Sequence, residues 1–275
     1  MLIGHKQRIL DLKRLANAKT LSHAYLFWGP ERIGKRTVAH AFGNFLENGV
    51  FEKIHEGGIL KDAVLVSPDA ERKIGIDAVR ELQYFLWQKP VESPRRLVII
   101  DQGERLTPQA QDALLKIAEN PPASSLLVLI VTNPDRITQT LRSRFQALYF
   151  AHVPESEIFA WLESQGVPTK KAKEAVSESL GAPGYAYARI NDPSFANREK
   201  EIQKLFANSE ALRSTAIKEF ISRDDFDLEE LLDGAIRHLA QKRDFARWHD
   251  FLELRKNAAS LNLNPRIQLE ALLQD

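Results

Sequence analysis

Residues 96–122 read RLVIIDQGERLTPQAQDALLKIAENPP, and this stretch decides the fold class. Leu97 to Ile100 is an uninterrupted apolar run, as is typical of a strand that is buried on both faces of a parallel sheet. Asp101 follows at the carboxyl end of this strand, where open α/β sheets place their ligand chemistry. Thr107 is suited to cap a helix, which the prolines at 121 and 122 end.

Four more apolar runs predict further strands, at residues 24–28, 63–66, 126–131 and 146–150. Helical periods lie between them. This alternation predicts an α/β domain with a five-stranded parallel sheet and helices on both faces.

The first of these strands leads directly into the stretch GPERIGKRT, which has the spacing of a P-loop in Gly29, Gly34 and Lys35. Backbone N–H groups of such a loop surround phosphate, and the lysine reaches the β- and γ-phosphates. The next position normally supplies a hydroxyl that holds Mg²⁺. Here it is Arg36, and Thr37 points about 100° away because it is one residue further along the helix.

A P-loop together with a strand that ends in Asp101 corresponds to a Walker A and a Walker B motif, in which Asp101 would hold Mg²⁺. The residue after this aspartate is normally a carboxylate that polarises the attacking water. Here it is Gln102, whose amide cannot act as a general base. The changes at 36 and 102 together predict a P-loop ATPase fold that does not hydrolyse ATP efficiently.

The composition is that of a globular protein, with 275 residues, 44% hydrophobic and 27% charged, which is enough for two or three domains. A net charge of +1 gives no global field that would attract nucleic acid or a membrane surface. The absence of cysteine removes disulfides, thiol nucleophiles and zinc–cysteine sites. No signal peptide or membrane span is recognisable, so we expect a cytoplasmic protein.

After Phe150 the pattern becomes entirely helical. Helices are expected at 154–165, 169–180 and 184–190, and Asn191-Asp192-Pro193 is a candidate linker. The rest of the chain is charged and amphipathic, and it contains no catalytic residue set. A terminal helical bundle of this kind is usually a core or a subunit interface.

The sequence resembles the delta-prime family of bacterial DNA polymerase III clamp-loader subunits, within the AAA+ superfamily, over nearly its full length. The stretches that carry the resemblance are SHAYLFWGPERIGKRT (22–37), IDAVREL (76–82), AQDALLKIAENPP (110–122), TNPDRITQTLRSRF (132–145) and NLNPRIQLEALL (262–273). The combination of ALLK with LRSR is highly specific, whereas the P-loop alone is not.

The resemblance implies three domains: an AAA+ domain at 1–152, a helical lid at 153–192 and an all-α collar at 193–275. It also implies a five-membered ring with tau/gamma-like motor subunits and a delta-like subunit, which loads a sliding clamp on primed DNA. Polymerase chemistry would belong to other chains.

The family's Ser-Arg-Cys motif supplies an arginine finger to the ATP site of a neighbouring subunit. It matches Ser143-Arg144, with Phe145 in place of the cysteine. The alternative is an ordinary surface arginine. The lid arginine of active members is matched by Tyr185. Asn133 matches the polar sensor position, although an asparagine that forms a turn before Pro134 would look the same.

The family often has four zinc-binding cysteines after the P-loop helix. This chain has none, and its segment 47–59 is short, so no zinc is expected. The P-loop leaves open whether ATP or ADP binds without turnover.

Two functions therefore compete. The first is a ring subunit that does not hydrolyse ATP but completes a neighbour's site. The second is an active AAA+ motor, tau/gamma-like or similar to a small subunit of replication factor C. Residues 36, 102 and 185 favour the first. A third and weaker possibility is a stand-alone P-loop regulator, since the collar-like tail and the LRSR stretch at 141–144 argue against it.

Overall fold

The computed structural model describes residues 2–52, 59–206, 210–222, 226, 228–258 and 265–273. Part of the segment 47–59, and the first three residues of the stretch 262–273, lie outside these ranges. The chain forms two compact units, one of residues 1–166 with 181–184 and the other of residues 167–180 with 185–275. Among the described residues, no helix is both long and apolar enough to cross a membrane.

The first unit is built around a five-stranded sheet with the strand order β2-β3-β4-β1-β5, and every neighbouring pair is parallel. The strands are β1 (Ala24–Trp28), β2 (Ala63–Val66), β3 (Arg96–Ile100), β4 (Ser125–Val131) and β5 (Gln146–Tyr149). The five predicted strands are confirmed. Each observed boundary lies within one residue of the predicted one, and all residues of β3 and β4 are buried, as uninterrupted apolar runs require.

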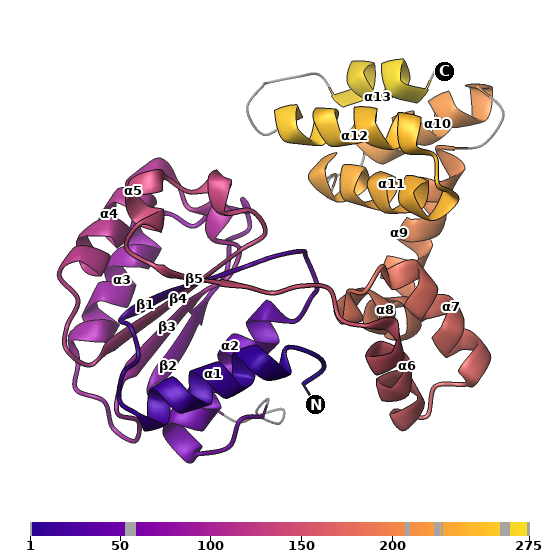
Figure 1. The fold of residues 1–275 in the computed structure, drawn as a ribbon. Coiled ribbons are helices and arrows are strands. Elements are labelled where there is room, and N and C mark those ends of the chain that lie inside the picture. The colour runs from indigo at the N-terminus through magenta and orange to yellow at the C-terminus, as the bar shows by residue number, and fades with distance from the viewer. Residues whose placement is uncertain are drawn as a thin grey trace. The chain divides into compact units, whose positions relative to one another are not determined.

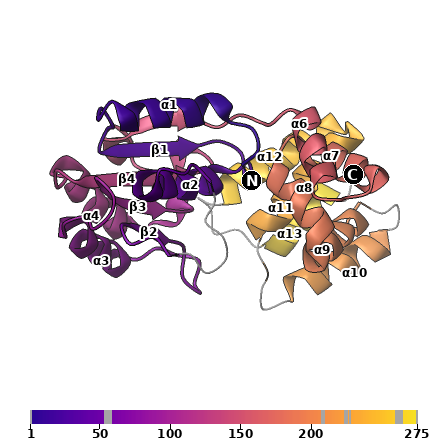
Figure 2. The ribbon, with the colours of Figure 1, turned by 90° about the horizontal axis from the view of Figure 1, so that it is seen from below.

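Helices cover both faces of this sheet (Figure 1). The helices of one face are α1 (Lys6–Asn17) and α2 (Lys35–Asn48), and those of the other are α3 (Ile76–Trp87) and α4 (Pro108–Glu119). Figure 2 shows α1 from the side, lying along the sheet. The unit also contains the 3₁₀ turns η1 (Gly103–Arg105) and η2 (Pro134–Arg136), the short helix α5 (Gln139–Arg142) and the helix α6 (Glu155–Ser164).

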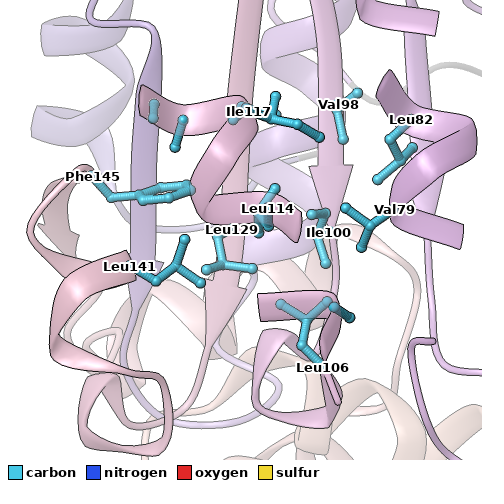
Figure 3. Close-up of a cluster of buried hydrophobic side chains, with 14 of the residues drawn as sticks. Val79, Leu82, Val98, Ile100, Leu106, Leu114, Ile117, Leu129, Leu141 and Phe145 are labelled. Carbon is cyan, nitrogen blue, oxygen red and sulfur yellow. The ribbon is translucent and has the colours of Figure 1, made fainter. Parts of the chain in front are cut away.

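The core between the sheet and α3 and α4 is shown in Figure 3. Val79 and Leu82 on α3 pack toward Val98 and Ile100 on β3. All four side chains are apolar and almost fully buried. Phe145 enters the same core just before β5. This packing fixes the carboxyl ends of the central strands, where the polar residues of the candidate site lie.

The second unit is helical. It contains α7 (Thr169–Ser179), most of α8 (Pro183–Asn191), α9 (Pro193–Lys204), α10 (Glu210–Ile221), α11 (Leu228–Lys242), α12 (Phe245–Ala258) and α13 (Pro265–Leu273). The expected linker at 191–193 is a junction between two helices: the Asp192 carboxylate caps α9 by accepting hydrogen bonds from the N–H groups of Ser194 and Phe195, at 3.0 and 3.1 Å.

Candidate functional site

The strand order brings the predicted site residues to one edge of the sheet. β4 lies between β3 and β1, and all three run in the same direction. Asp101 follows β3, Thr132 follows β4 and the P-loop follows β1. These three positions therefore gather at adjacent carboxyl ends, which is where sheets of this class bind ligands.

The P-loop has the backbone that its glycines permit. Gly29 has a φ of 143° and Gly34 a φ of 107°, both in the region that side chains disfavour. A Cβ atom at Gly29 would lie 2.2 Å from the backbone oxygen of Phe150, so the turn after β1 has no room for a side chain. The loop ends at Gly34, and α2 begins at Lys35.

Lys35 is buried and folds back over the loop. Its Nζ donates hydrogen bonds to the backbone oxygens of Gly29 and Pro30, at 2.7 and 2.6 Å. Burial lowers its pKa to about 8, and the charge of Glu104 is the strongest influence in the opposite direction. The ammonium group is thus held against the backbone of the loop, at the cost of partial desolvation.

Two groups that the sequence did not reveal hold the other side of the loop. The Nε2–H of His5 donates to the backbone oxygen of Ile33 at 2.8 Å. The N–H of Gly184 donates to the backbone oxygen of Arg32, also at 2.8 Å. Burial lowers the pKa of His5, which favours the neutral ring. No local pattern signals these contacts, because His5 and Gly184 lie far from the loop in sequence.

Arg36 and Asp101 form an ion pair. The Nη1 atom of Arg36 lies 3.4 Å from the Oδ2 atom of Asp101, and the arginine side chain is 57% exposed whereas the carboxylate is only 14% exposed. Burial raises the pKa of Asp101, and Arg36 and the N–H of Gln102 offset part of this. Thr37 lies half-buried one residue further along α2.

These residues do not fit a magnesium ion of the Walker type. Position 36 offers no hydroxyl ligand, and a guanidinium lies against the carboxylate that the ion would require. Gln102 follows Asp101 with a φ of 53°, and its amide cannot accept a proton from water.

Glu104, on η1, is the other carboxylate at this edge. Its Oε1 accepts hydrogen bonds from the backbone N–H and the hydroxyl of Thr132, at 3.1 and 2.6 Å. Its charge is the largest single influence that favours protonated Lys35. Thr132 is a further site residue that sequence reasoning missed, although its place directly after a fully buried strand was a usable signal.

Asn133 is exposed, and its side-chain oxygen accepts a hydrogen bond from the N–H of Asp135 at 2.9 Å. This contact caps η2. It is the contact of the turn-forming alternative, and its role as a nucleotide sensor stays a prediction.

Ser143 ends α5, and its hydroxyl donates to the backbone oxygen of Thr140 at 2.8 Å. Arg144 follows with its side chain 47% exposed, and its Nη2 atom donates to the Oε1 atom of Glu119 at 3.0 Å. Phe145, in place of the family's cysteine, is 8% exposed and packs in the core (Figure 3). Buried Phe145 therefore anchors the chain next to an exposed guanidinium.

In the second unit, the hydroxyl of Tyr185 is bonded to the guanidinium of Arg237. The same guanidinium lies 3.9 Å from the centre of the tyrosine ring and donates to Glu199 at 2.7 Å. Tyr185, which the resemblance matches to the lid arginine, is thus part of a polar cluster of α8, α9 and α11.

Comparison with known proteins supports this architecture. This chain is similar in structure to a DNA polymerase III gamma subunit-related protein from Thermotoga maritima, with a TM-score of 0.51 and 20% sequence identity. The match covers 96% of this chain and 97% of the Thermotoga chain. At this identity the similarity concerns the fold alone. The chain accordingly has an AAA+ P-loop fold followed by further helices.

Curated relatives are similar in sequence over part of the chain. The delta' subunit of DNA polymerase III from Escherichia coli (strain K12) is 31% identical over 56% of this chain and 46% of its own length. The gamma/tau subunit from Mycobacterium bovis is 29% identical over 60% of this chain and 31% of its own. The matched region thus spans less than half of each of these two relatives.

The family described as "DNA polymerase III, delta subunit" matches residues 4–154, more than half of the chain and all of the region that holds the P-loop, Asp101 and Arg144. The protein belongs to this family of DNA polymerase III delta subunits.

Proposed function

We propose that this protein is a delta-prime-type subunit that hydrolyses ATP poorly or not at all and supplies Arg144 to the ATP site of a neighbouring subunit. In this role it assists the loading of a sliding clamp on primed DNA during replication. The observation that carries the proposal is the Arg36–Asp101 ion pair, because it occupies the carboxylate that a catalytic Mg²⁺ would need, while Arg144 remains exposed.

The chain's own site lacks three parts of a hydrolytic centre. Position 36 has no metal-binding hydroxyl, position 102 has no carboxylate, and Tyr185 replaces the lid arginine. Glu104 is the remaining candidate base, but one of its oxygens already accepts two hydrogen bonds from Thr132. These two bonds occupy the oxygen that would otherwise accept a proton from the attacking water.

Arg144 has the properties that a finger in trans requires. An arginine guanidinium is planar and cationic, and it can bind phosphate oxygens through two N–H groups at once. Glu119 engages it through one nitrogen atom, Nη2, in a pair in which both side chains are more than one-third exposed. Phe145 holds the adjacent backbone in the core, so the arginine would reach outward from a fixed point.

The assembly proposed here is a five-membered cytoplasmic ring with tau/gamma-like motors and a delta-like subunit. Residues 1–152 would form the AAA+ domain, 153–192 the lid and 193–275 the collar through which the subunits associate. The P-loop would hold ATP or ADP without turnover, with Gly29, Gly34 and Lys35 around the phosphates.

The direct test is Arg144→Ala in a reconstituted clamp loader. The ring should still assemble, while hydrolysis at the site that Arg144 completes should fall by roughly 10³-fold, as is typical of lost arginine fingers. The DNA-stimulated ATP hydrolysis rate of the whole ring should therefore fall by the fraction that this one site contributes. Arg142→Ala is the matched control, because Arg142 is a similarly exposed neighbour that pairs with Asp135. An unchanged rate in the Arg144→Ala ring would refute the finger assignment.

The alternative function is an active motor, which the similarity to a gamma/tau subunit favours. It is tested by ATP turnover of the purified chain with and without primed DNA. The passive-subunit proposal expects no turnover. Turnover that requires Mg²⁺, and that Glu104→Gln abolishes, would establish the motor instead.

A further inference from the structure

We propose that the Arg36 guanidinium takes the place of the magnesium ion beside Asp101, so that this P-loop binds the metal-free polyphosphate of a nucleotide. Magnesium would then leave nucleotide binding unchanged or weaken it, whereas it tightens binding in working P-loops. The inference rests on the nucleotide binding proposed above and deepens it by naming the ionic form of the ligand.

The position of Arg36 is the first step. It lies in the first turn of α2, directly after Lys35, so its backbone is where the metal-binding hydroxyl of a P-loop would be. From there its Nη1 atom reaches to 3.4 Å from Asp101 Oδ2. Arg36 thus replaces the hydroxyl that would be one magnesium ligand, and it also pairs with Asp101, the carboxylate that would be the second ligand.

The second step is the difference in solvent exposure between the two paired side chains. The side chain of Asp101 is 14% exposed, whereas that of Arg36 is 57% exposed. The guanidinium therefore extends from the buried carboxylate toward solvent, with part of its surface still accessible. An arginine has five N–H donors in a planar fork, so the groups that do not face Asp101 can bind phosphate oxygens, as a guanidinium commonly does.

The third step is charge. Lys35 and Arg36 are adjacent cations at the amino end of a 14-residue helix, which itself favours anions. Asp101 and Glu104 oppose them, and Glu31 adds a further negative charge near Lys35. A divalent cation placed at Asp101 would meet the Arg36 guanidinium at close range, and like charges at such a distance repel strongly. An uncomplexed diphosphate carries more negative charge than its magnesium complex and meets no such repulsion.

The experiment is a fluorescence titration of the full chain with N-methylanthraniloyl-ADP, once with excess EDTA and once with excess MgCl₂. The wild-type chain should bind at least as tightly in EDTA as in MgCl₂. Arg36→Thr restores the usual hydroxyl and frees Asp101, so its binding should become tighter in MgCl₂ than in EDTA. Arg80→Thr is the matched control, because Arg80 is a similarly exposed arginine that pairs with Asp77 on α3. It should behave as the wild type does.

A second readout follows the metal directly. Mn²⁺ replaces Mg²⁺, and its electron paramagnetic resonance signal is recorded with ADP present. Arg36→Thr should immobilise the ion in a protein-bound complex, whereas the wild-type chain should leave the Mn²⁺–ADP spectrum unchanged. Tighter binding of the fluorescent nucleotide in MgCl₂ by the wild type, or immobilised Mn²⁺ in the wild type, would overturn the inference.

No binding of the fluorescent nucleotide by the wild type in either buffer would also overturn it. None of these results would affect the proposed role in clamp loading, because that role is tested separately by the hydrolysis rate of the Arg144→Ala ring.

Discussion

Replacement of the buried Asp62 by asparagine should destabilise the first unit far more than a single-charge change at its exposed surface. Asp62 precedes β2 and is 1% exposed. Its carboxylate accepts hydrogen bonds from three successive backbone N–H groups, those of Val91, Glu92 and Ser93, at distances of 2.6–2.9 Å. These groups lead into β3, the strand that ends at Asp101, so the contact fixes the entry of a central strand.

The magnitude follows from the number of donors. Burial acts to raise the pKa of Asp62, but the three N–H groups and the nearby Arg96 outweigh burial and lower it. Asparagine keeps one oxygen but turns an NH₂ group, which cannot accept, toward the remaining donors. At least one buried N–H group therefore loses its acceptor, and the other N–H groups bond to a neutral oxygen in place of a charged one. Each such loss costs about 1–3 kcal/mol, which gives a total of about 3 kcal/mol. For a unit of this size the melting temperature should fall by about 6–12 °C.

The assay is thermal and urea unfolding of the full chain, followed by circular dichroism. Asp77→Asn is the matched control, because its side chain is 84% exposed and pairs with Arg80. It should change stability by less than about 0.5 kcal/mol. The lowered pKa means that the ionised form of Asp62 stabilises the fold. The difference in unfolding free energy between wild type and Asp62→Asn should therefore be largest at neutral pH, and it should shrink as the pH falls and Asp62 becomes protonated. A difference below about 0.5 kcal/mol at neutral pH would refute the reasoning.

Three further predictions concern the site. Glu119→Gln should raise hydrolysis at the site that Arg144 completes by up to about fivefold, because an exposed pair that Arg144 must leave is worth roughly 0.2–1 kcal/mol; a rate as low as that of Arg144→Ala would mean that Glu119 positions the finger instead. Nucleotide affinity should fall as the pH rises through about 8, where Lys35 loses its proton, and should be about tenfold lower at pH 9; a flat titration from pH 7 to 10 would contradict this. Gly29→Ala should lower the unfolding free energy, measured by urea titration, by about 3 kcal/mol, since the added Cβ would lie 2.2 Å from a backbone oxygen. Gly49→Ala is the control: Gly49 has a φ of 75° and open space around it, so the change should cost only about 1–2 kcal/mol.

The sheet could be predicted because each strand is marked locally. Residues 97–100 and 126–131 are uninterrupted apolar runs, and a strand with no polar side must be buried on both faces wherever it lies in the sheet. The strand order is a different matter. It places β4 between β3 and β1, and this pairing depends on packing between residues that are a hundred positions apart.

The site was predictable to the same extent. Gly29, Gly34 and Lys35 were found from spacing, because the backbone of a phosphate loop demands those residues at those intervals. The change from threonine to Arg36 was also visible in the sequence. Its contact with Asp101 was not, because the two residues are 65 positions apart and meet only at the edge of the sheet.

Other contacts had no local signal at all. Asn133 has the same neighbours in sequence whether it senses a nucleotide or caps a turn, and only the hydrogen bond from Asp135 distinguishes the contact it makes. Tyr185 was noted as a missing arginine, but its bond to Arg237 joins residues 52 positions apart. Asp192 was expected in a linker, and its carboxylate instead caps α9.

The sequence by itself determined the class of fold, the P-loop and the loss of the residues at 36 and 102 on which hydrolysis depends, because all of these are set by short-range patterns of apolar residues, glycine and charge. Only the tertiary structure decided which charges meet: Arg36 with Asp101, Glu104 with Thr132, and Arg144 with Glu119. The physical reason is that an ion pair or a hydrogen bond forms over a few ångströms of space, and the separation of two residues along the chain says little about that distance until the strands are paired and the helices are packed on them.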